Sequence, residues 1–255
     1  MQTNRTDAQF EELEETERQV TLEHIAAMLL LLGETREAIR QESISFYHKY
    51  GRDGVITYNE VRKWISLKDR RRRLNVFLIH IESVFALLHG KLEDEFGLLE
   101  DDIKRLELEF FDLEELEDFA FGDWGQDDSN WLERLDEDIA LWIYYLCSDT
   151  KRAIMRADTL EDLLKQYDKR FTTMENVLRR LGMTESSAFT TLARKAIFKE
   201  FGVGMYRYYA RVDERTCETC GELHDKVFPI SAYEVGVTAP PIHPSCRCWT
   251  VPVWD

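Results

Sequence analysis

The residues best suited to chemistry lie in two short clusters near the C-terminus. Cys217 and Cys220 form a C-x-x-C pair, and His243, Cys246 and Cys248 follow after one further loop. Four of the five cysteines in the 255-residue chain therefore lie in these clusters. Thiolate and imidazole ligands in two closely spaced groups are typical of a tetrahedral zinc site. The pattern predicts a structural Zn²⁺ held by four of these five residues.

The spacing leaves open which four residues bind the ion. His243 and Cys246, three positions apart, would complete a site opened by the C-x-x-C pair. Cys246 and Cys248 would do so equally, because side chains two positions apart on a strand point to the same side. Arg247 between them would then point away from the ion and pair with an acid or a carbonyl group. His224, in the loop between the clusters, is a weaker additional candidate.

Two other uses of the cysteines compete with metal binding. A thioredoxin-like redox pair would begin a helix within a βαβ pattern and would not need a second cysteine cluster. Disulfides between the clusters would need an oxidising, extracellular environment. The polar, acidic segment Met1–Glu15 has no apolar core of a signal peptide, which favours the metal. Cys147, outside both clusters, is expected to be a small buried hydrophobe.

Short strands are predicted to position the clusters. Residues 205–212 are rich in aromatic and β-branched side chains, which indicates a strand before the first cysteine pair. Residues 226–230 and 247–253 predict two further strands. The sequence therefore predicts that residues 201–255 form a small α+β module resembling a zinc knuckle.

The preceding part, residues 1–200, is predicted to be helical. Its apolar residues recur at steps of three and four, as in amphipathic helices. The fold class is therefore α+β, with a mostly α-helical N-terminal part. Gly33 is a candidate helix break, Thr159 and Thr184 are candidate N-caps, and residues 122–129 read as an internal linker. The predicted helices cover residues 9–41, 58–88, 98–119 and most of 130–202.

Residues 53–60 resemble the second half of a calcium-binding EF-hand loop. Such a loop would begin at Lys49 and place Gly51 at its third position, so two carboxylate ligands would be missing. A turn followed by an N-capped helix is the better interpretation of this segment.

The charge of the chain argues against a protein whose main task is to bind nucleic acid. Lys and Arg number 33 against 49 Asp and Glu, a formal net charge of −16, whereas such binding needs a basic face. The run Arg70–Arg73 is interpreted as a solvated helix face that pairs with nearby acids, and contact with nucleic acid or an acidic partner is the alternative. The early apolar run 25–32 is too short to span a bilayer, so no membrane partner is expected. Secondary contact with DNA is assigned to cations of the tail region: Arg194, Lys195, Lys199, Arg207, Arg211 and Arg215.

The tail also carries a resemblance to a known family. Its motifs are D-x-R-T-C-x-x-C at 213–220, L-H-x-K-V-F at 223–228 and P-P-I-H-P-x-C-R-C at 240–248. In order and spacing they resemble the C-terminal signature of the phage Mu F-like minor head proteins, which act in head morphogenesis of tailed phages and prophages. The resemblance is dense from about residue 192 to residue 252.

The resemblance implies a minor capsid protein that is made in the host cytoplasm and resides in the virion, in the capsid interior or at the portal vertex. The implied partners are the portal protein, a scaffold or major capsid protein and, secondarily, packaged DNA, with no small-molecule substrate. Lys195 and Asp225 depart from the family pattern, where an acid and a glycine are usual. A non-enzymatic role agrees with the residues, which show no nucleophile–base pair and no Gly-rich phosphate loop, so no catalytic residue is expected.

Two alternatives from other functional classes stay open. One is a nucleic-acid-binding protein that uses the zinc knuckle together with the basic tail residues. The other is a metal-dependent hydrolase or nuclease with His243 or His224 at an open metal site. The acidic composition of the chain disfavours the first alternative, and a closed site with four protein ligands disfavours the second.

Overall fold

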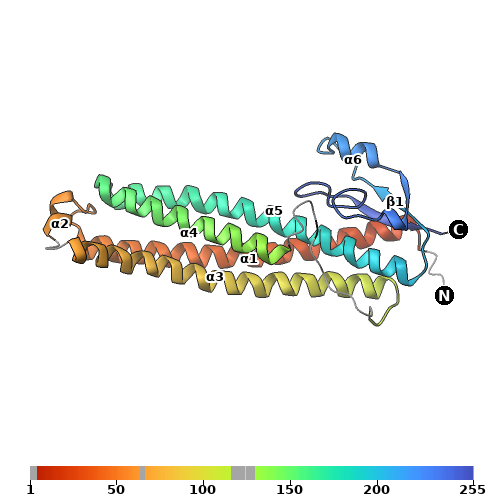
Figure 1. Cartoon of the computed structure of the whole chain (residues 1–255), viewed down its shortest axis with the longest axis horizontal. Coiled ribbons are helices and arrows are strands. Elements are labelled where there is room, and N and C mark those ends of the chain that lie inside the picture. Colours follow the sequence, from red (N-terminus) through yellow and green to blue (C-terminus); the bar gives the residue numbers. More distant parts are fainter. Residues whose placement is uncertain (1–4, 64–66, 116–123, 125–129, 255) are drawn as a thin grey trace. The chain divides into compact units, whose positions relative to one another are not determined.

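The computed structural model describes residues 5–63, 67–115, 124 and 130–254, without the side chains of Tyr58, Leu67 and Arg70. The chain is mostly helical, with a small antiparallel sheet near its C-terminus, so the predicted fold class is confirmed (Figure 1). The elements are α1 (Asp7–Tyr50), α2 (Tyr58–Lys63), α3 (Leu67–Phe110), α4 (Trp131–Arg156), α5 (Leu160–Glu200), β1 (Met205–Tyr209), α6 (Glu218–Leu223), β2 (Val227–Pro229), the 3-10 helix η1 (Ile230–Ala232) and β3 (Trp249–Val253).

The chain forms two compact units, each assembled from segments that are far apart in the sequence. Unit 1 comprises residues 1–26, 95–131 and 179–255, and unit 2 comprises residues 27–94 and 132–178. Helices α1, α3 and α5 each contribute one end to unit 1 and the remainder to unit 2. The boundary predicted at residue 200 falls within unit 1. That residues 1–200 fold without the tail stays a prediction.

Unit 2 is a helical bundle with its own core. Phe46 of α1 stacks on Phe77 of α3 with ring centroids 4.8 Å apart. Phe85 of α3 stacks on Phe171 of α5 at 6.4 Å, and α4 contributes the fully buried side chain of Leu146. Burial of aromatic and aliphatic side chains of this size is the main favourable contribution to folding.

The segment that resembled an EF-hand is a tight turn followed by a capped helix, as predicted. Asp53 and Gly54 both have positive φ angles, 51° and 73°. The Thr57 hydroxyl then accepts a hydrogen bond from the Glu60 N–H at 3.2 Å, and the Glu60 carboxylate accepts one from the Thr57 N–H at 2.9 Å. This reciprocal pair is a capping box, which satisfies two backbone donors at the start of α2.

The other local predictions had mixed outcomes. Thr159 caps α5, accepting a hydrogen bond from the Asp162 N–H at 3.0 Å. The prediction that Thr184 is an N-cap is wrong, because Thr184 lies inside α5 and its hydroxyl donates to the Arg180 carbonyl oxygen at 2.6 Å. Gly33 does not break α1, which continues to Tyr50. A single helical glycine costs only about 1 kcal/mol relative to alanine, which the rest of a long helix offsets.

Helices predicted over 58–88 and 98–119 are divided differently in the structure. α2 is a short separate helix, and α3 runs without a break from 67 to 110. Residues 116–119 of the last predicted helix lie outside the described residues. The linker predicted at 122–129 also lies outside them, apart from Trp124.

The three predicted strands form one antiparallel sheet in the order β2-β1-β3. Tyr206 of β1 pairs with Phe228 of β2 and with Pro252 of β3. Side chains of β1 alternate in burial, and Tyr206 and Tyr208 are fully buried. The sheet therefore presents one face of β1 to the interior of unit 1.

Aromatic residues from the sheet and from the helix ends share one core in unit 1. Phe10 of α1, Phe111 after α3 and Phe198 of α5 pack with Tyr233 and Val251 of the C-terminal region. α1 and α5 also approach closely, because a Cβ atom on Gly182 would lie 2.7 Å from Cγ1 of Ile25. The C-terminal module and these helix ends are therefore one packed structure.

Candidate metal centre

The first cysteine pair is positioned by the short helix α6. Cys217 is the N-cap of α6, and its sulfur accepts a hydrogen bond from the Cys220 N–H at 3.3 Å. The hydrogen bond from this backbone N–H lowers the pKa of Cys217. A thiol held at a helix start in this way is prepared to act as a thiolate ligand.

The second cluster lies in the loop that leads into β3. The Cys246 N–H donates to the His243 carbonyl oxygen at 3.1 Å, which closes a tight turn. Ser245 within this turn has a φ of 58°, and its N–H donates to the hydroxyl of Thr184 at 2.9 Å. Thr184, mistaken for a helix cap from the sequence, instead fixes this loop to α5. Cys248 directly precedes the first residue of β3.

The fold brings all five predicted ligands together around Cys220. Its sulfur lies 3.3 Å from Nε2 of His243 and 3.8 Å from the sulfur of Cys246. Ligand atoms of Cys217, Cys220 and His243 lie within 4.8 Å of one another, as do those of Cys220, Cys246 and Cys248. Cys220 therefore belongs to both groups.

These distances fit a tetrahedral zinc ion. Bonds of about 2.3 Å to sulfur place two sulfur ligands roughly 3.8 Å apart, which is the separation of the Cys220 and Cys246 sulfurs. A disulfide would need about 2.05 Å, and all five cysteines of the chain are free. The cluster of thiols and one imidazole could therefore hold a metal ion.

The sulfurs lie in a mostly buried environment. Cys220, Cys246 and Cys248 are buried, and the hydroxyl of Tyr208 donates to the Cys220 sulfur at 3.5 Å. Burial raises the pKa of Cys220 to about 12, whereas the hydrogen bond from Cys248 lowers the pKa of Cys246 to about 5. Shielding from water strengthens each electrostatic interaction at such a centre.

Residues around the cluster fix its orientation. As predicted, Arg247 pairs with an acid: its guanidinium donates two hydrogen bonds to Asp213, at 2.6 and 2.7 Å. His224 does not join either group of ligands. Its Nδ1 accepts a hydrogen bond from the Ala210 N–H at 3.1 Å, so this histidine connects α6 to the end of β1.

The region that contains the cysteine and histidine cluster matches a known protein family. Residues 146–251 match a family model described as phage Mu protein F like protein. This segment is phage Mu F-like. It contains α5, β1, β2, most of β3 and both cysteine clusters, and it covers less than half of the chain. The resemblance predicted from the tail motifs is confirmed, and it extends back into α4.

The match supports a phage head morphogenesis protein. The chain matches no curated protein and no solved structure. Among the described residues, no helix combines the length and the apolar content needed to cross a bilayer.

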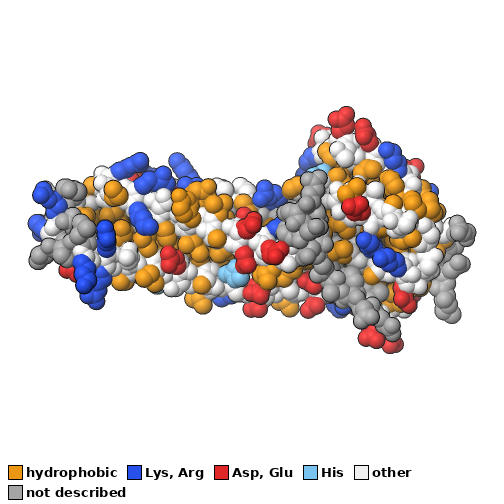
Figure 2. All heavy atoms as spheres, in the orientation of Figure 1, with side chains coloured by type: hydrophobic (Ala, Val, Ile, Leu, Met, Phe, Trp, Pro, Cys, Tyr) orange, Lys and Arg blue, Asp and Glu red, His pale blue; other side chains and the backbone are white. Residues whose placement is uncertain are grey.

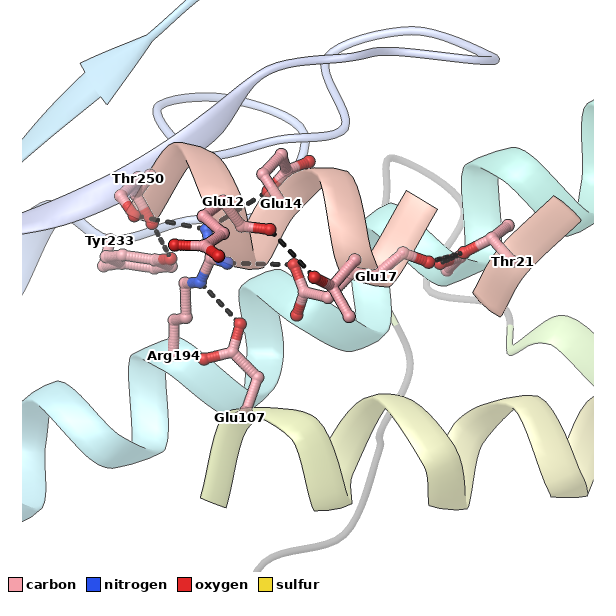
Figure 3. Close-up of polar contacts among 10 residues, drawn as sticks. Glu12, Glu14, Glu17, Thr21, Glu107, Arg194, Tyr233 and Thr250 are labelled. Atoms are coloured by element: carbon pink, nitrogen blue, oxygen red, sulfur yellow. Dashed lines mark hydrogen bonds and ion pairs between the residues drawn. The ribbon is translucent and has the colours of Figure 1, made fainter. Parts of the chain in front are cut away.

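Within the Mu F-like segment, Arg194 lies at the centre of a buried cluster of charges (Figure 3). Its Nε donates to Glu107 at 2.6 Å, Nη2 to Glu17 at 2.9 Å, and Nη1 to Glu14 at 3.4 Å and to the Thr250 carbonyl oxygen at 3.3 Å. The side chains of Arg194 and Glu107 have no exposed surface. One guanidinium thereby connects α1, α3 and β3 to α5.

The charges in this cluster do not balance if every carboxyl group is ionised. Burial raises the pKa of Glu14 to about 8 and also raises the pKa of Glu17 and Glu107. Oε1 of Glu17 and Oε2 of Glu107 have no hydrogen-bond partner among the described residues. Buried carboxyl groups in such surroundings retain protons at a pH where exposed ones are ionised.

Arg194 was predicted to contact DNA, and the structure corrects this. A guanidinium without exposed surface, already bonded to three carboxyl groups, is not accessible to a phosphate. Arg207 and Arg211 are paired with Asp225 and Glu15, at 3.4 and 3.3 Å. Lys195 is partly buried, and Lys199 and Arg215 are exposed. DNA contact by these five residues stays a prediction.

The buried charge cluster was missed by sequence reasoning, although a signal for it existed. Along α1, Phe10, Leu13 and Ile25 define an apolar face, and Glu17 and Thr21 occupy the positions of that face between them. A carboxyl group on the buried face of a helix indicates a buried partner. The partner could not be read from the sequence, because Arg194 lies 177 positions away.

Proposed function

We propose that this protein is a minor capsid protein that acts in head morphogenesis at the portal vertex. The family match over residues 146–251 carries the proposal. The protein acts by docking to other head proteins, with the portal as the main partner and a scaffold or major capsid protein as further partners. Its place is the virion, in the capsid interior or at the portal vertex, and its role is structural and non-enzymatic.

A structural zinc ion belongs to this proposal. Four of Cys217, Cys220, His243, Cys246 and Cys248 hold it, with Cys220 in every arrangement because it belongs to both groups of ligands. By binding ligands from both segments, the ion would cross-link α6 to the start of β3. Such an ion contributes directly to the folding free energy of a small module. It keeps the loops before β3 in one conformation for docking.

The charge of the chain supports docking to proteins over DNA as the main task. A net charge of −16 repels the phosphate backbone at long range, so only a local basic surface would hold DNA. Three cations that the sequence suggested for DNA contact do not supply such a surface, since Arg194 is buried and Arg207 and Arg211 face acids.

The test is co-purification with the portal protein of the same phage or prophage. The two proteins are co-expressed, the portal carries an affinity tag, and the retained fraction of this chain is measured at low and moderate salt. We expect retention in both conditions. Changing Lys199 and Arg215 to glutamate should leave retention intact, because protein docking does not depend on those cations. Absence of this chain from portal complexes and from purified heads would refute the proposal.

A further inference from the structure

The positive charge of this acidic chain is concentrated in one part of unit 2. Residues 49–73 contain nine Lys or Arg and only three Asp or Glu, and residues 151–156 contain three Lys or Arg and no acid. These stretches cover the end of α1, α2, the start of α3 and the end of α4. Figure 2 shows Lys and Arg side chains gathered around α2 and the neighbouring helix ends.

Specific contacts bring these stretches to the same end of unit 2. Val55 pairs with Thr159 in an antiparallel bridge, which joins the turn before α2 to the turn before α5. The guanidinium of Arg73 lies over the ring of Tyr50, 5.1 Å from its centroid, which joins the start of α3 to the end of α1. Cations that are up to 107 positions apart in the sequence therefore form one surface, which we call the basic end.

Much of this charge is not neutralised by the protein. Some cations are paired, as Arg52 is with Glu60 at 3.4 Å and Arg152 is with Asp149. Others are exposed and have no ion pair with an acid among the described residues. Held close together, they repel one another, which disfavours the folded state until an anionic partner binds. They are Lys49, Lys68, Arg71, Arg72, Lys151 and Arg156.

We propose that the basic end binds the phosphate backbone of duplex DNA. Three of these six exposed cations are lysines, a residue type depleted at protein–protein interfaces but common in phosphate contacts. Met155 is the only large hydrophobic residue that is strongly exposed among residues 151–156, so this part has no apolar centre for a protein partner. The choice of DNA over RNA rests on the proposed function in a phage head.

The proposal moves DNA contact away from the tail cations and into unit 2. It also reconciles DNA contact with a net charge of −16, because exposed charges more than about 10 Å away are largely screened at moderate salt. Binding of this kind is independent of base sequence and depends steeply on salt.

The test uses the full chain and a short labelled duplex DNA, with affinity measured by fluorescence anisotropy from about 50 to about 200 mM salt. The double variant Arg71→Gln/Arg72→Gln removes two exposed charges from the basic end. We expect it to weaken binding on the order of tenfold and to reduce the slope of log K against log salt by about 2. Lys49→Gln/Arg156→Gln should do the same, which guards against a local folding defect.

The matched control is Lys199→Gln/Arg215→Gln, which removes the same charge from exposed positions of the Mu F-like segment. It should bind DNA like the unchanged protein. The proposal is overturned if the control loses affinity and the basic-end variants do not, or if the unchanged protein does not bind duplex DNA at the lowest salt. It is also overturned if the basic-end variants lose the portal and keep DNA, because the surface would then dock a protein.

The two proposals fail separately. If the chain does not bind DNA but is still retained by the portal, only the proposal that the basic end binds DNA is refuted. If the portal does not retain this chain, but DNA affinity depends on Arg71 and Arg72, only the proposed docking function is refuted.

Discussion

Arg194 donates a 2.6 Å hydrogen bond to Glu107, although the two residues are 87 positions apart and neither side chain has any exposed surface. The pair joins α5, in the Mu F-like segment, to α3, outside it. Removing one member of a buried ion pair leaves an uncompensated charge, which is far more costly than the loss of an exposed pair.

Arg194→Ala should therefore destabilise unit 1 by roughly 3–5 kcal/mol. The free energy of unfolding is measured by urea denaturation, followed by circular dichroism. Arg215→Ala is the control, because Arg215 is exposed and its loss should change stability by about 0.5 kcal/mol or less. Similar midpoints for the two variants would show that the buried cluster does not stabilise the fold.

The same cluster predicts a dependence of stability on pH. The pKa of Glu14 is about 8 in the folded chain, against an ordinary value of 4.5, and burial is the main cause. The pKa values of Glu17 and Glu107 are raised as well. Arg194 faces both of these carboxyl groups, and Tyr233 faces Glu107. Because the folded state holds these protons more tightly, the contribution of these carboxyl groups to stability is greatest near and below pH 4.5 and is lost as the pH rises towards 8.

This dependence can be assigned to Glu14 by substitution. Glu14→Gln keeps the shape of the side chain and removes its titration, so its melting temperature should fall less between pH 5 and pH 8 than that of the unchanged protein. Glu11→Gln serves as the control on an exposed position of the same helix. Identical pH profiles for the unchanged protein and Glu14→Gln would contradict the prediction.

The zinc proposal predicts that zinc is lost when a cysteine of the cluster is replaced and is kept when a cysteine outside the cluster is replaced. Cys220→Ser removes the residue common to both ligand groups, so stoichiometric zinc, about one ion per chain, should be lost. Cys147→Ser removes a buried cysteine outside the cluster and should retain the zinc. Metal content is measured by mass spectrometry on reduced protein. Equal zinc in both variants, or none in the unchanged chain, would refute the site.

Truncation after Gly202 tests whether the helical part folds independently. We expect a soluble product that melts cooperatively, because unit 2 has its own core and contains no residue beyond 178. The truncation removes Tyr233 and Val251, which pack against Phe10, Phe111 and Phe198. Amide hydrogen exchange should therefore become faster at the ends of α1, α3 and α5 that belong to unit 1. An aggregated product would show that residues 1–200 are not a domain.

The sequence by itself determined the class of this fold and the position of the cysteine and histidine cluster that could hold a metal ion. Both follow from local rules, because helical periodicity, strand composition and the C-x-x-C spacing each depend on residues within a few positions of one another. The three strands, the cap at Thr159 and the pairing of Arg247 with an acid were predicted on that basis. The resemblance to Mu F-like proteins was likewise carried by a local run of motifs.

Tertiary structure decided which charges face water and which do not. Arg194 looks like any other cation in the sequence, and only the approach of α1, α3 and β3 buries it against Glu17 and Glu107. Thr184 has the sequence of a helix cap, but the loop before Cys246 gives it a different partner. The basic end arises in the same way, from turns that are distant in the sequence and adjacent in the bundle. The physical reason is that long-range Coulomb and hydrogen-bond partners are set by packing, which no local pattern encodes.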